Sequence, residues 1–292
     1  MIAISDVHRR ERRTEREENL NRYERPEEPP QLPMVEVNET TRASRAEQPV
    51  PTPRIVPTRI PGLDNLIRGG LPNISLILVV GTIGSNYTTF IEQILYNHLS
   101  DGGKVAYYTA ETSSLDIMQE MESFGWSLRR LLASGQWLFV DVLTPDLQRL
   151  AELAPEGFNM LRVTLSRSLN ALKTDLLGRI KEDRWTVLHL SHILHNYDLK
   201  EVMGLLLYWR AAVRAYGGVH FAVLPSAVHP DMSVNALKNI ADGVVEFQLR
   251  EGPRDYEGIL IIQKLRGLRT ARRVPFTVME EGISVETAER IR

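Results

Sequence analysis

The sequence predicts an α/β fold built around a mostly parallel β-sheet. From Thr58 onward, short apolar runs alternate with amphipathic stretches of helical period. A loop typical of phosphate binding follows the first of these runs, and the C-terminal part consists of strand-like segments separated by short turns. Strands that alternate with helices pair in parallel and carry helices on both faces. We therefore expect a three-layer sandwich with antiparallel strands at its C-terminal edge.

The predicted elements follow one another in a regular order. Ser113 or Ser114 suits the N-cap of one helix, and Gly217 and Gly218 end another. The predicted parallel strands cover 75–80, 104–109, 137–142, 185–190 and 219–224, the predicted helices cover 88–99, 114–123, 169–181 and 198–216, and an antiparallel set of strands covers 244–249, 258–265, 274–279 and 283–285.

Composition excludes several classes of function. The 292 residues include 35 Lys+Arg and 37 Asp+Glu, so the formal charge of -2 provides no general attraction for nucleic acid or acidic lipid. The absence of cysteine excludes disulfides, thiolate nucleophiles and cysteine-ligated metals. No apolar run reaches the roughly 20 residues of a membrane-spanning helix, and the charged N-terminus does not resemble a secretory signal. We therefore expect a cytoplasmic protein.

The first 57 residues differ in composition from the remainder. They contain ten arginines, no lysine and eleven acidic residues, and nine of the 16 prolines lie within the first 61 residues. Such a segment buries too little apolar surface to offset the entropy of ordering. We expect a disordered tail over 1–57 and one folded domain over 58–292. The alternative is a segment that folds on contact with a partner.

The loop after the first predicted strand carries the main functional signal. Gly81 and Thr88 match the phosphate-loop pattern G-x-x-x-x-G-K-[ST], but Asn86 and Tyr87 replace its second glycine and its lysine. Asparagine tolerates a positive φ, so the backbone shape is expected to survive. Tyr87 has no ammonium group, which weakens phosphate binding by about 1.5–3 kcal/mol. The predicted nucleotide-binding residues are Gly81, Gly84, Ser85, Asn86, Tyr87, Thr88 and Thr89.

Residues 58–92 resemble the opening of KaiC-like members of the RecA superfamily, where T-G-[IV]-P-G-[LF]-D-x-L-[LI]-x-G-G-[LI]-P leads into the phosphate loop. The segments VAYYTAETSS and IIQKLRG are also similar to the family's catalytic-glutamate strand and K-x-R-G strand end. Residues 124–126, 132–138 and 274–285 look most like the accessory ATPase of the archaellum motor. The resemblance implies a RecA-like P-loop NTPase fold, ATP and Mg²⁺ as cofactors, and a homo- or hetero-oligomeric ring. It also implies motor or filament-platform partners, at the periphery of a membrane-bound machine.

The family's catalytic positions are only partly kept. Glu111 matches the first glutamate of the pair that polarises the attacking water, but Thr112 replaces the second. Leu190 stands where the family has a magnesium-orienting aspartate. Thr88 remains a candidate Mg²⁺ ligand, but without a carboxylate partner it would hold the ion poorly. The resemblance therefore implies weakened ATP binding and, because a hydrolase needs all these roles together, a pseudo-enzyme.

Lys264 and Arg266 match the K-x-R-G residues that reach the terminal phosphate bound by a neighbouring subunit. By resemblance they form a trans-interface finger. The alternative is a basic strand end that lies at an oligomer interface or in water.

We expect a regulatory or structural nucleotide-sensing subunit rather than an active ATPase. One alternative is an ATPase in which another lysine or arginine replaces the missing one. A second is a recombinase-like accessory protein that binds DNA, although the 25 basic and 26 acidic residues after position 57 disfavour it. His189, His192 and His195 predict no metal site, because a spacing of three in a strand alternates faces.

Overall fold

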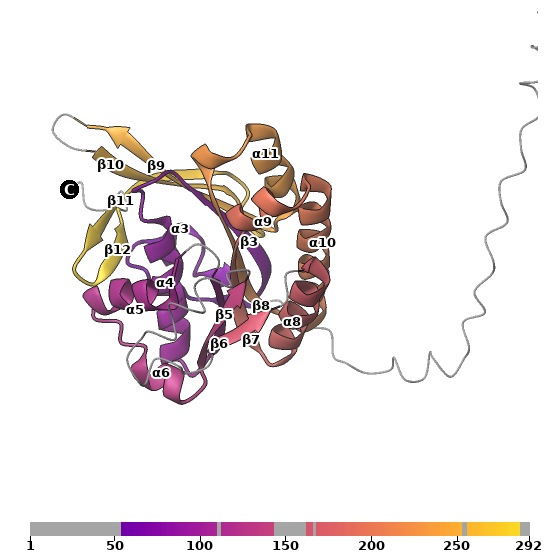
Figure 1. The fold of residues 1–292 in the computed structure, drawn as a ribbon. Coiled ribbons are helices and arrows are strands. Elements are labelled where there is room, and N and C mark those ends of the chain that lie inside the picture. The colour runs from indigo at the N-terminus through magenta and orange to yellow at the C-terminus, as the bar shows by residue number, and fades with distance from the viewer. Residues whose placement is uncertain (1–53, 110–111, 143–161, 166–167, 253–255, 287–292) are drawn as a thin grey trace, which may run out of the picture. The chain divides into compact units, whose positions relative to one another are not determined.

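The computed structural model describes residues 54–109, 112–142, 162–165, 168–252 and 256–286 (Figure 1). Within these ranges, a ten-stranded sheet has the order β12-β11-β10-β9-β3-β8-β7-β4-β5-β6. Its strands are β3 (Ile74–Gly81), β4 (Lys104–Thr109), β5 (Trp137–Val142), β6 (Arg162–Leu165), β7 (Arg184–His189), β8 (Gly218–Pro225), β9 (Gly243–Glu251), β10 (Tyr256–Lys264), β11 (Arg272–Met279) and β12 (Gly282–Val285).

Helices cover both faces of this sheet (Figure 1). On one face lie α3 (Leu63–Leu66), α4 (Tyr87–Ser100), α5 (Ser114–Ser123) and α6 (Arg129–Ala133), and on the other α8 (Leu169–Lys181), α9 (Ser191–Asn196), α10 (Leu199–Tyr216) and α11 (Asp231–Ile240). The three-layer α/β fold predicted from the sequence is thereby confirmed. No helix in the described ranges combines the length and apolar character needed to cross a membrane.

The burial of β3 follows from its place between the two helical layers. All eight of its residues are buried, as expected for a parallel strand that is covered on both faces. Tyr107 and Tyr108 in β4 alternate between the faces, so that Tyr107 packs with α4 and Tyr108 with α8 and α10. The apolar runs therefore mark strands, and the helical stripes mark the layers that cover them.

Strand pairing differs from the expectation at two places. Val244–Leu249 was expected to belong to the antiparallel set, but the strand that contains it, β9, pairs in parallel with β3 and antiparallel only with β10. In addition, β1 (Ile55–Val56) pairs with β2 (Leu71–Pro72), so the end of the segment expected to be a disordered tail is structured. Residues 1–53 lie outside the described ranges.

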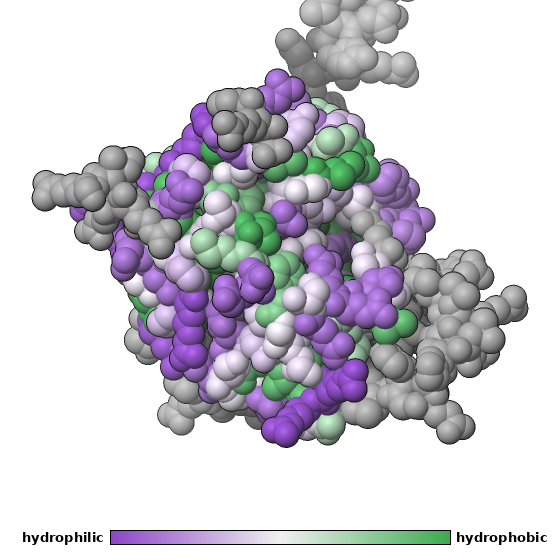
Figure 2. Space-filling view, turned by 90° about the vertical axis from the view of Figure 1, so that its left-hand side faces the viewer, coloured by the Kyte–Doolittle hydropathy of each residue, from purple (hydrophilic) through white to green (hydrophobic). Residues whose placement is uncertain are grey.

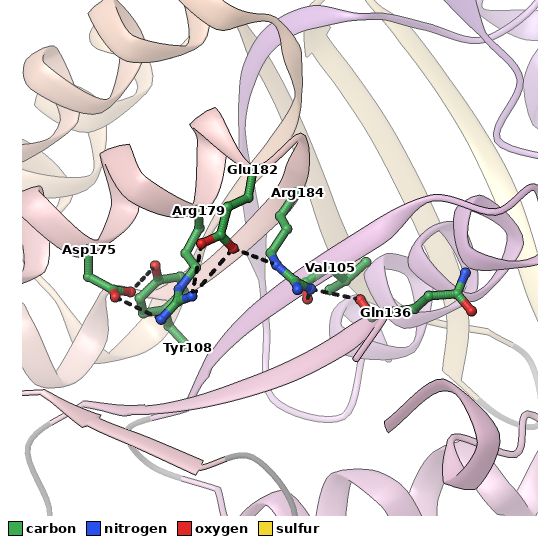
Figure 3. Close-up of polar contacts among 7 residues, drawn as sticks. All are labelled: Val105, Tyr108, Gln136, Asp175, Arg179, Glu182 and Arg184. Atoms are coloured by element: carbon green, nitrogen blue, oxygen red, sulfur yellow. Dashed lines mark hydrogen bonds and ion pairs between the residues drawn. The ribbon is translucent and has the colours of Figure 1, made fainter. Parts of the chain in front are cut away.

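A chain of polar side chains joins α8 to strands β4 and β7 (Figure 3). The Tyr108 hydroxyl donates to Asp175 (2.6 Å), and Asp175 also accepts from Arg179 (3.1 Å). Glu182 bridges Arg179 and Arg184, and the Arg184 guanidinium group donates to the carbonyls of Val105 in β4 and Gln136 just before β5. These hydrogen bonds and ion pairs tie α8 to the start of β7, although Nε of Arg179 stays buried without a partner among the described residues.

Candidate functional site

The predicted phosphate loop lies at the carboxyl edge of the parallel strands. It leaves β3 after Gly81 and enters α4 at Tyr87, while β8 and β9 flank β3 on either side. Ligands of open α/β sheets bind at this edge, because the loops that follow the strands gather there. The loop also leads into the N-terminus of α4, and the N-terminal end of a helix favours an anion.

The loop backbone is curled and held by local bonds. Asn86 has φ 54° and ψ 30°, and Gly84 has φ 80°, so both adopt left-handed conformations. The Ser85 N–H (3.1 Å) and hydroxyl (2.7 Å) both donate to the Thr82 carbonyl, and the Thr82 N–H donates to Phe247 in β9 (3.1 Å). Asn86 therefore takes the left-handed conformation that its replacement of glycine requires.

Tyr87 replaces the missing lysine with a packed ring. A Cβ added at Gly81 would lie 2.0 Å from Cδ1 of Tyr87, so the ring rests directly on the backbone at the end of β3. The side chain is half-buried against the core beneath α4. Only glycine at position 81 admits this packing. The position that would balance phosphate charge is thus occupied by an aromatic side chain that stabilises the core.

The two threonines after Tyr87 differ in their surroundings. Thr88, the candidate Mg²⁺ ligand, is half-buried, whereas Thr89 is buried and donates a hydrogen bond to Glu120 of α5 (3.4 Å). Gly81, Ser85 and these threonines therefore lie around one loop between β3 and α4. Glu111 lies outside the described residues.

The structure places Leu190 and its neighbour His189 on opposite faces of the sheet. Leu190 is fully buried in the core on the α10 side of the sheet, away from α4. His189, the last residue of β7, faces the α4 side, where its Nε2 lies 3.0 Å from the Tyr107 hydroxyl. His189 is therefore the side chain that approaches the loop helix from this strand. Neither of these two side chains carries a carboxylate.

A buried polar cluster beneath the loop helix was not found from the sequence. The Tyr107 hydroxyl donates to Oε1 of Glu92 on α4 (3.3 Å), while Oε2 of Glu92 is buried without a hydrogen-bond partner. Burial, reinforced by Glu120, raises the pKa of Glu92 to about 8, and burial lowers the pKa of His189 to about 4. The available signal was a glutamate on the apolar face of a predicted helix.

Polar residues at the ends of β7 and β8 form a second cluster. The hydroxyl of Ser191 lies 2.8 Å from Nε2 of His229, and the rings of His195 and His229 are 5.0 Å apart. The described residues contain no group of three or more His, Asp or Glu placed to hold a metal. The strand-end histidines thus form hydrogen bonds beside the loop.

Lys264 and Arg266 lie at the opposite edge of the sheet. Lys264 donates to the carbonyls of Ala241 (2.6 Å) and Asn239 (3.4 Å), which end α11. Arg266 contacts the buried Asp242 (3.2 Å), which also pairs with two other arginines and accepts from the Leu76 N–H near the start of β3. Both predicted finger residues therefore have partners within their own chain, remote from their own phosphate loop.

Two cavities flank the loop. One, of about 310 Å³, is lined from the loop by Thr82 and from α11 and β9 by Lys238 and Glu246. The other, of about 700 Å³, lies between Gly84 and Asn86 and the strands β9 to β11. Figure 2, which faces the antiparallel strands, shows hydrophobic side chains among polar ones across this side of the molecule. The loop thus borders two cavities, and charged side chains line both of them.

A three-layer α/β sandwich, with a phosphate-loop motif between the first strand of its parallel sheet and the helix that follows, defines a RecA-type P-loop NTPase fold. The model of the family described as "ATPase: KaiC" matches residues 56–290, and the chain belongs to this family.

Individual relatives are distant. The chain is 25% identical over 240 residues to a UPF0273 protein of Thermotoga maritima, covering 80% of this chain and 96% of that protein. It is 28% identical over 237 residues to the circadian clock oscillator protein KaiC of Acaryochloris marina, covering 78% of this chain and 43% of that protein. The crystal structure of a KaiC-like protein of Pyrococcus horikoshii matches with a TM-score of 0.63 at 22% identity, covering 81% of this chain and 100% of that one. At this identity the match supports the fold alone.

Proposed function

We propose that this KaiC-family chain binds nucleotide weakly at its phosphate loop and does not hydrolyse it, and that it serves as a regulatory or structural subunit. The observation that carries the proposal is the packing of Tyr87 on Gly81, which removes the phosphate-balancing cation while the loop keeps its curled backbone. Phosphoryl transfer depends on charge neutralisation, so this loss reduces turnover more than binding. The end of β7 offers Leu190 and His189 but no carboxylate that could hold magnesium, which supports the same conclusion.

We further propose that the subunit acts within an oligomeric assembly of the archaellum-motor type. The resemblance of residues 124–126, 132–138 and 274–285 supports this partner class, and the basic edge around Arg266 supports a subunit contact. That edge places three arginines around the single carboxylate of Asp242, so it keeps an excess of positive charge. A head-to-tail contact would bring this edge toward the phosphate loop of the next subunit.

Calorimetric titration with ATP, followed by mass measurement on the same samples, tests both parts of the proposal. We expect weak ATP binding that changes little between Mg²⁺ and EDTA, because no carboxylate holds the ion at the β7 position. We also expect a mass above that of the 33.2 kDa monomer. Tight binding that requires Mg²⁺ would contradict the nucleotide proposal, and a strictly monomeric mass with and without ATP would contradict self-assembly.

A further inference from the structure

The cavity between Thr82 and α11 contains a lysine on the side of the sheet opposite to Tyr87. Its lining includes Thr82 from the loop, Ser226 from the 3-10 turn η1 (Ser226–Val228), and Lys238 from α11. Lys238 is the only lysine or arginine that lines this cavity in the described part of the chain. A cation therefore faces a space that the phosphate loop itself borders.

An unsatisfied loop hydroxyl marks this cavity as a place for a polar ligand. Oγ1 of Thr82 is buried and has no hydrogen-bond partner among the described residues. A buried polar atom without a partner is costly, and a ligand oxygen or an ordered water in the cavity would relieve that cost. At about 310 Å³ the cavity has several times the volume of about 30 Å³ that one water molecule occupies in the liquid.

A carboxylate holds Lys238 close to the start of the loop. The ammonium group of Lys238 pairs with the carboxylate of Glu246, and both side chains are largely buried. Glu246 lies opposite Val80 in the β3–β9 pairing, one residue before Gly81. An ammonium group has three donors, so one can remain with Glu246 while another binds an anion in the cavity. Asp231 also lines the cavity but is exposed at its rim, where water screens its charge.

We infer that Lys238 supplies the phosphate-binding cation that Tyr87 cannot, so that the terminal phosphates of a nucleoside polyphosphate lie between Thr82 and Lys238. The inference rests on the proposed function, since it assigns a ligand contact at the same loop. The cation reaches the phosphates from α11 and from the opposite face of the sheet, instead of from the first turn of α4. Glu246 holds the ammonium group in place when the site is empty.

The test compares ATP, inorganic tripolyphosphate and AMP in calorimetric titrations of the full chain. Lys238→Ala should weaken ATP and tripolyphosphate binding about tenfold or more, because one charge-assisted contact is lost, and should leave AMP binding within about twofold. Glu246→Gln, which releases Lys238 from its carboxylate, should tighten ATP binding severalfold. The matched control is Lys104→Ala, since Lys104 is exposed at the opposite edge of the sheet.

Circular dichroism shows whether each variant is folded. If Lys238→Ala does not fold, Lys238→Gln replaces it in the test, because glutamine keeps a hydrogen-bond donor for Glu246 but carries no charge. Unchanged ATP affinity in a folded Lys238 variant overturns the inference and leaves the proposed function standing. An equal loss for AMP overturns it as well, because the effect is then not directed at the terminal phosphates. If the unaltered chain binds neither ATP nor tripolyphosphate, the proposed function fails, and the inference fails with it.

Discussion

Tyr87→Lys combined with Asn86→Gly should tighten ATP binding by about ten- to a hundredfold, since one charge-assisted contact to phosphate contributes about 1.5–3 kcal/mol. The backbone needs little change, because Asn86 already has the left-handed conformation that glycine takes in this motif. Lysine at 87 also leaves the face of Gly81, against which the tyrosine ring now packs. Titration calorimetry of both proteins measures the gain.

The matched control for this variant is Tyr87→Met with Asn86→Gly, which removes the ring and adds no charge. We expect this control to bind ATP as weakly as the unaltered chain. Both variants should be somewhat less stable, because the ring of Tyr87 contributes to the core beneath α4. Equal affinities in the lysine and methionine variants would show that the missing ammonium group does not limit binding.

Glu92→Gln should abolish a fall in stability between about pH 6.5 and pH 8. Burial raises the pKa of Glu92 from 4.5 to about 8, and Glu120 adds to the shift while the Tyr107 hydrogen bond opposes it. Between these pKa values the folded chain keeps a proton that the unfolded chain releases. The free energy of unfolding therefore falls as pH rises, by up to about 1.4 kcal/mol per pH unit, and the contribution is fully present below pH 4.5.

Histidines with lowered pKa values act in the opposite direction at lower pH. Burial lowers the pKa of His98, His189 and His220 to about 4, so the unfolded chain binds more protons between pH 4 and 6.5 and stability rises with pH there. The effect of Glu92 is therefore clearest above pH 6.5. Denaturant unfolding at several pH values measures it, with the exposed Glu281→Gln as control. If the free energy of unfolding changes with pH in the same way in Glu92→Gln and in the unaltered chain, Glu92 is not the group responsible for the fall.

Local pattern was sufficient to predict most of the fold. The helix Ser114–Ser123 and its N-cap follow from sequence, because Ser113 accepts a hydrogen bond from the Asp116 N–H as such caps do. The long helix α10 begins after Asp198, which forms a capping box with Glu201. The loop between β3 and α4 likewise lies where the sequence pattern places a strand–loop–helix turn. Each of these features depends on neighbours only a few residues apart.

Features that depend on distant contacts were not accessible to the same reasoning. The face on which a strand-end side chain lies depends on where the strand stops, and the neighbours His189 and Leu190 lie on opposite faces of the sheet. The partners of Lys264 and Arg266 lie at the end of α11 and in the turn before β9, so no local pattern reveals them. The Glu92 cluster likewise joins α4 to β4 and β7, which only the folded sheet brings together.

The rate of ATP hydrolysis in the presence of Mg²⁺, measured on the full chain and on Glu111→Gln, tests the central claim most directly. Phosphate release should stay at the background rate of the buffer for both proteins, because Tyr87 stands in place of the motif lysine on α4 and the β7 strand end lacks a carboxylate. Sustained release well above background by the unaltered chain, abolished by Glu111→Gln, would contradict the claim and identify the chain as an active ATPase.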